Sequence, residues 1–107
     1  MFENGSIGNY RKIFIKCGYT DLRCGIRSLS EMLRLLYNVS FEEGDLYVFC
    51  GKSAKTFKGL IYEKEGFLLV SILLDVDRVK WIRDGDDIVE ITSEQFQRIL
   101  KGNKVRE

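Results

Sequence analysis

The sequence contains no histidine and no proline. The absence of histidine excludes Ser-His-Asp and Cys-His catalysis and every histidine-containing metal site. Lysine can in principle activate a serine or cysteine nucleophile, but no carboxylate pair stands in an apolar setting that would separate its pKa values. We therefore expect a protein that is not an enzyme and that uses no metal and no cofactor.

The sequence also lacks a long apolar run. The longest covers 67–74 and is interrupted by Ser71, far short of the roughly 20 residues that a membrane helix needs. The first residues do not show the basic and then apolar regions of a signal peptide. Cys17, Cys24 and Cys50 form an odd set whose spacing matches no zinc motif. We expect reduced thiols in a cytoplasmic protein that makes no membrane contact.

Neither sign of charge is in marked excess. Seventeen Lys and Arg against sixteen Asp and Glu give a formal net charge of +1, so only the distribution of charge can point to a nucleic-acid partner. The 107 residues, 45% of them hydrophobic, suit one domain over 1–107. Within it, 1–9 is expected to be a loose lead-in and 103–107 a frayed basic tail.

Apolar residues at helical spacing follow Thr20 and Asp21, either of which can cap a helix. Their steps of four, three, four and three predict a buried helical stripe formed by Leu22, Ile26, Leu29, Leu33 and Leu36. Asn38 marks the expected end of this long helix.

The rest of the chain is typical of strands joined by tight turns. Strands are expected at 13–15, 46–50, 56–62, 67–74, 79–82 and 88–91. The apolar run 67–74 suits a central strand covered on both faces, and Trp81 is expected in the core. Thr92 and Gln95 form a capping box that opens a short helix through Leu100.

These elements predict an α+β fold. Because the connections look too short for parallel crossovers, we expect a mainly antiparallel meander sheet of about five strands. One long N-terminal helix packs on this sheet, and a short C-terminal helix ends the domain.

Basic side chains gather in two places. On a helical wheel Arg23, Arg27 and Arg34 fall within about 40° of one another, so they can lie on a phosphate backbone or simply form a solvated face. Lys52, Lys55 and Lys58 lie in and after the turn at 51–53. They can grip phosphates or keep a hairpin soluble. All six are candidate nucleic-acid contacts.

Two other motifs have simpler explanations. Gly51-Lys52-Ser53 lacks the upstream glycine and the following helix of a phosphate-binding loop. The acidic stretch 84–87 favours a hairpin turn over a cation site, because the further ligands of a calcium loop are missing.

The stretch Thr20-Asp21-Leu22-Arg23-Cys24-Gly25-Ile26 carries a resemblance to a known family. Together with 46–49, 58–62 and 66–69, it resembles the TnpB-like accessory protein, the short second reading frame of the bacterial insertion-sequence sixty-six family. The resemblance extends over 13–102. It assigns Asp21, Arg23 and Gly25 to a shared N-terminal motif and Lys58 to a shared position in a hairpin.

This resemblance implies a non-catalytic accessory protein of DNA transposition. Its implied partners are DNA, the separate transposase of the same element, or both. The alternative is an adaptor that binds the transposase through a sheet edge or aromatic patch and does not contact DNA. The sequence departs from the family at Ile72 and Leu73, where relatives carry a Lys-Arg pair. Two basic residues have thus become apolar, which weakens any DNA-binding face on that strand.

Overall fold

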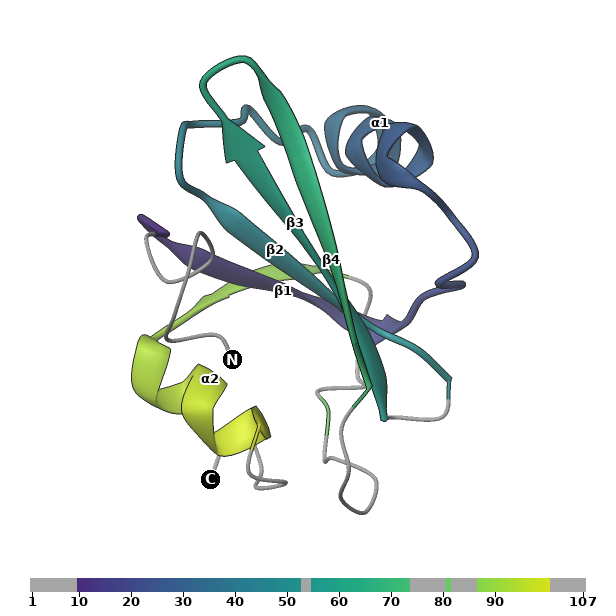
Figure 1. The fold of residues 1–107 in the computed structure, drawn as a ribbon, viewed down its shortest axis with the longest axis vertical. Helices are drawn as coiled ribbons and strands as arrows, with labels where there is room; N and C mark the ends of the chain where they lie inside the picture. The colour runs from purple at the N-terminus through teal and green to yellow at the C-terminus, as the bar shows by residue number, and fades with distance from the viewer. Residues whose placement is uncertain (1–9, 53–54, 74–80, 82–86, 101–107) are drawn as a thin grey trace.

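A computed structural model describes residues 10–52, 55–73, 81 and 87–100 (Figure 1). The elements follow in the order β1 (Ile13–Tyr19), α1 (Ile26–Leu36), β2 (Leu46–Cys50), β3 (Thr56–Glu63), β4 (Gly66–Leu73), β5 (Ile88–Ile91) and α2 (Ser93–Leu100).

The five strands form a mixed sheet in the order β4-β3-β2-β1-β5. β1 and β2 are parallel, with Ile13 opposite Leu46 and Ile15 opposite Val48, whereas the other three pairings are antiparallel. The predicted antiparallel meander is therefore wrong. The connection between β1 and β2 carries α1, and a crossover of that length allows a parallel return.

The predicted long helix is also wrong, because α1 has 11 residues and begins at Ile26. Its N-cap is Gly25, which has an extended backbone and makes no side-chain capping bond. Neither Thr20 nor Asp21 caps it. The Asp21 carboxylate instead accepts the backbone N–H of Arg23 at 3.0 Å, closing a local turn before the helix starts.

α1 covers one face of the sheet with only part of the predicted stripe. Leu29 and Leu33 are fully buried and pack in one cluster with Tyr47, Phe49 and Leu60 of the strands. Leu36 is 74% exposed and Ile26 is 39% exposed. At about 100° per residue Leu36 turns roughly 60° away from Leu33, and Ile26 lies at the open end of the helix.

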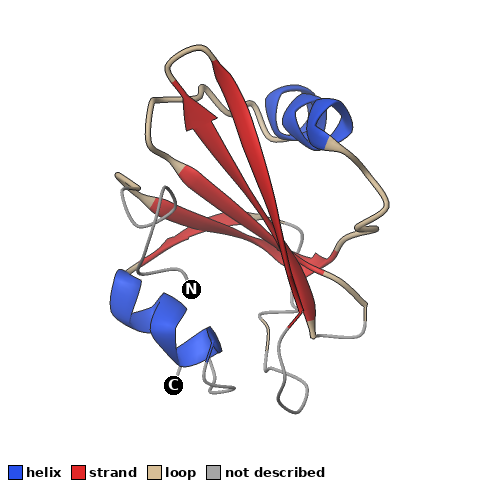
Figure 2. Cartoon of the chain, viewed as in Figure 1, coloured by secondary structure: helices blue, strands red, loops and turns tan. Residues whose placement is uncertain are grey.

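α2 covers the opposite face, so the two helices flank the sheet (Figure 2). Phe96 and Ile99 pack there against alternate strand residues such as Ile15, Val48 and Ile61. Trp81, 6% exposed, belongs to the same cluster, and its indole N–H donates to the carbonyl of Lys16 at 3.0 Å. The prediction that Trp81 is a core residue is confirmed.

The other predicted elements have mixed outcomes. The strand at 46–50 and the capping box are confirmed, since Thr92 and Gln95 exchange hydrogen bonds of 2.8 and 3.0 Å. The apolar strand β4 lies at the edge of the sheet and not at its centre. The strand predicted at 79–82 falls outside the described residues except for Trp81.

We expect Leu33→Ala to lower the free energy of unfolding by about 2–5 kcal/mol, because it opens a cavity between α1 and the sheet. Leu35→Ala, on the same helix at a side chain that is 74% exposed, is the matched control and should change stability by no more than about 0.5 kcal/mol. Urea denaturation measures both. Equal losses would contradict the placement of α1.

Candidate functional site

The loop between β1 and α1 is organised by an Asp21–Arg23 ion pair. The Arg23 guanidinium donates from Nη2 to Asp21 Oδ2 at 2.8 Å and from Nε to Oδ1 at 3.0 Å. These bonds hold the pKa of Asp21 at about 2, helped by the backbone N–H of Arg23 and by the charge of Lys58. The Arg23 side chain remains 91% exposed, so its other N–H groups face solvent.

Lys58 reaches the same loop from the sheet. Its ammonium donates to the carbonyl of Cys24 at 3.2 Å, although 34 residues separate the two in sequence. The next residue, Gly25, is the N-cap of α1. The structure thus brings all four residues of the predicted motif, Asp21, Arg23, Gly25 and Lys58, to one site.

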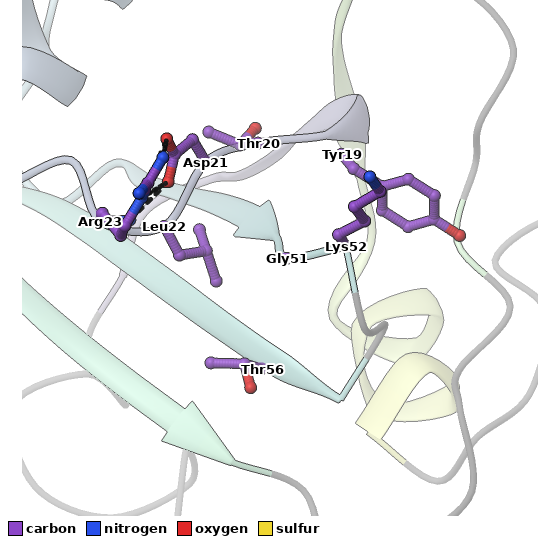
Figure 3. A pocket seen from close by; sticks show the side chains of 8 residues that line it. All are labelled: Tyr19, Thr20, Asp21, Leu22, Arg23, Gly51, Lys52 and Thr56. Atoms are coloured by element: carbon purple, nitrogen blue, oxygen red, sulfur yellow. Dashed lines mark hydrogen bonds and ion pairs between the residues drawn. The ribbon is translucent and has the colours of Figure 1, made fainter.

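A pocket of about 720 Å³ lies beside this loop, where the carboxyl ends of β1 and β2 meet (Figure 3). In open sheets with parallel strands this edge is the usual place for a ligand. The pocket is lined by residues of the loop and of the two adjoining strand ends: Tyr19, Thr20, Asp21, Leu22, Arg23, Gly51, Lys52 and Thr56. In Figure 3, Lys52 lies away from the Asp21–Arg23 pair.

The predicted stripe of three arginines does not form, because Arg23 precedes the helix. Arg27 and Arg34 share one flank of α1, about 20° apart at 100° per residue, and both are exposed. The Arg34 guanidinium lies 5.6 Å from the centre of the Phe41 ring, a cation–π contact. Lys52 and Lys55 are exposed near the start of β3.

Sequence reasoning missed an ion pair between the exposed Arg11 and the buried Asp45 at the opposite end of β1 and β2. Asp45 is 2% exposed, and its carboxylate oxygens lie 3.0 and 3.2 Å from Nε and Nη2 of Arg11. The position of Asp45 directly before an apolar strand was the available signal. Within the described ranges, no group of three potential metal ligands comes together, and no helix has the length and apolar character to cross a membrane.

Comparison with known proteins identifies the family. The family model described as IS66 Orf2 like protein matches residues 11–107. The chain belongs to the IS66 Orf2-like family. One relative, the "Uncharacterized protein y4hO" of Sinorhizobium fredii, is 28% identical over 95 residues, which cover 89% of this chain and 83% of that protein. No solved structure matches. The resemblance to the insertion-sequence sixty-six family is thereby confirmed, and the chain is associated with an insertion sequence.

We expect Arg23→Gln to raise the pKa of Asp21 from about 2 toward 3.8, because the substitution removes the guanidinium that favours the carboxylate. The ion pair stabilises the fold at pH values above the unfolded-state pKa of Asp21. That contribution is lost as the pH falls from about 4 to about 2. An NMR titration of the Asp21 carboxyl carbon measures this directly. A pKa that stays near 2 in Arg23→Gln would contradict the role given to the pair.

Proposed function

We propose that this IS66 Orf2-like protein is a non-catalytic accessory factor of transposition that contacts DNA phosphates through the loop 20–25 and the start of α1. Family membership supports the association with an insertion sequence. The phosphate contact is supported by the convergence of the four motif residues at the N-terminus of α1.

The first turn of α1 is suited to an anion. The unbonded N–H groups of a helix N-terminus carry partial positive charge, which favours phosphate. No acidic residue lies in this turn to satisfy it, and the exposed Arg27 adds a full charge. Arg23, held by Asp21, presents its remaining N–H groups to solvent from the loop directly before the helix.

Gly25 also supports a phosphate contact, because neither its backbone conformation nor its packing requires a glycine. Its φ of −95° is open to any residue, and a Cβ placed there would meet no atom within 4 Å. The packing of the chain therefore does not explain a glycine at this motif position. A partner that approaches the helix N-terminus closely does explain it, because a side chain would obstruct that approach.

The six predicted basic residues then divide into two roles. Lys58 positions the loop through the carbonyl of Cys24. We assign phosphate contact to the exposed cations Arg23, Arg27, Arg34, Lys52 and Lys55. Because these contacts are to phosphates and not to base edges, we expect affinity with little sequence preference.

The alternative, an adaptor of the transposase without DNA contact, needs an exposed sheet edge or an aromatic patch. β4 supplies such an edge among the described strands. The motif residues cluster at the start of β3, far from the β3–β4 turn. This favours the DNA proposal, because the adaptor hypothesis does not explain why they cluster.

Gly25→Asp separates a functional role from a structural one. Aspartate is a good N-cap, so the thermal stability should stay equal or rise. Its carboxylate would repel a phosphate at the helix N-terminus, and affinity for a fluorescently labelled duplex should fall at least roughly fivefold.

Lys64→Gln is the matched control, because it also lowers the net charge by one but lies in the exposed β3–β4 turn. It should leave the affinity within about twofold of the unmodified protein's. If both substitutions weaken DNA binding equally, the effect is one of net charge and not of the helix N-terminus. If the unmodified protein does not bind DNA at low salt, the adaptor hypothesis is favoured.

The salt dependence of binding gives a second test. Arg27→Gln should lower the slope of log affinity against log salt concentration by about 0.9, the value for one lost phosphate contact on duplex DNA. The loss should be the same for unrelated sequences. Anisotropy titrations with two duplexes at several salt concentrations check this, and a loss confined to one duplex would contradict backbone contact.

A further inference from the structure

Among the described strands, β4 is a long edge strand whose own residues lack the usual protection against pairing. Edge strands commonly carry charges or proline that block another strand. Gly66–Leu73 has neither over its eight residues. Phe67 and Leu69 pack partly against the α1 cluster, and Leu68 and Val70 pack partly against the opposite one. Leu73 is 73% exposed.

Within the described part of the chain, the backbone of β4 is paired on one side only. Glu63 and Gly66 are partners across a two-residue turn, and in such a hairpin this pair exchanges hydrogen bonds. Alternate residues from Gly66 therefore bond to β3, and the N–H and C=O groups of Phe67, Leu69, Ser71 and Leu73 point outward. Among the described residues, no backbone bond from a turn, loop or cap reaches them.

We propose that β4 pairs antiparallel with β4 of a second copy of this chain, forming a two-fold symmetric dimer with one continuous ten-stranded sheet. A strand that pairs with β4 must be uncharged and apolar on both faces, because it extends the apolar clusters on both faces of the sheet. β4 itself meets that requirement, so the edge is self-complementary.

The register follows from the pleat. Residues opposite each other in an antiparallel pair point to the same face, so a two-fold axis normal to the sheet must pass through a residue position. An axis at Val70 pairs the whole of 67–73 and sets the exposed Leu73 opposite Phe67. An axis at Leu69 would set Leu73 opposite the charged Glu65. The pairing of two apolar side chains, Leu73 and Phe67, favours the axis at Val70.

Sedimentation velocity of the full chain tests the dimer. We expect twice the mass of one chain. The dissociation constant of the dimer should rise at least roughly tenfold in Ser71→Pro, which removes an outward N–H in both copies while leaving the β3 bonds. Leu73→Lys, at a side chain exposed in the single chain, should have the same effect through a charge opposite Phe67. Far-UV circular dichroism checks that both variants fold.

Disulfide trapping tests the register. In a Cys24→Ser background, Val70→Cys should cross-link copies on mild oxidation, because the two on-axis Cα atoms would lie about 4.5 Å apart. Leu68→Cys is the matched control on the same face and should not cross-link. The proposal would be overturned if the chain stays monomeric or if the dimer is insensitive to both edge variants. It would also be overturned if Leu68→Cys cross-links instead, or if β4 pairs only with transposase.

Discussion

The parallel pairing of β1 with β2 is the constraint on which the other features depend. At its start the pair of strands is fixed by the ion pair of Arg11 with the buried Asp45 and by the backbone bond from Leu46 to the carbonyl of Lys12. A parallel return needs a crossover, and here the crossover carries α1 across one face of the sheet. The two strand ends therefore open at the same edge as the loop 20–25.

This arrangement explains why the motif residues meet. β3 pairs antiparallel with β2, so Lys58, opposite Phe49, lies near the carboxyl end of β2 and reaches the loop. The proposed dimer would place both copies of α1 on the same face of the joined sheet, because its axis is normal to that sheet. Two loops facing one side suit a single DNA molecule, and avidity would then add to the affinity of each.

Local signals predicted local structure well. The capping box at Thr92 and the strand at 46–50 depend on neighbouring residues, and both are confirmed. The topology was missed because alternation along a strand does not reveal which strand it pairs with. Leu22 continued the helical spacing, yet the Asp21–Arg23 turn delays the helix. The same pair removed Arg23 from the predicted stripe, whereas the contact of Lys58 with Cys24 depends on a pairing that spacing alone does not encode.

The most direct test of the account is to map the proposed DNA contact residue by residue. Backbone amide NMR spectra of the ¹⁵N-labelled chain would be recorded as an unlabelled duplex is added. The account predicts the largest shifts at Arg23, Gly25 and Arg27, with Lys52 also affected and the turn at 64–65 unchanged. Shifts confined to α2 or to the β3–β4 turn, or none at all at low salt, would contradict it.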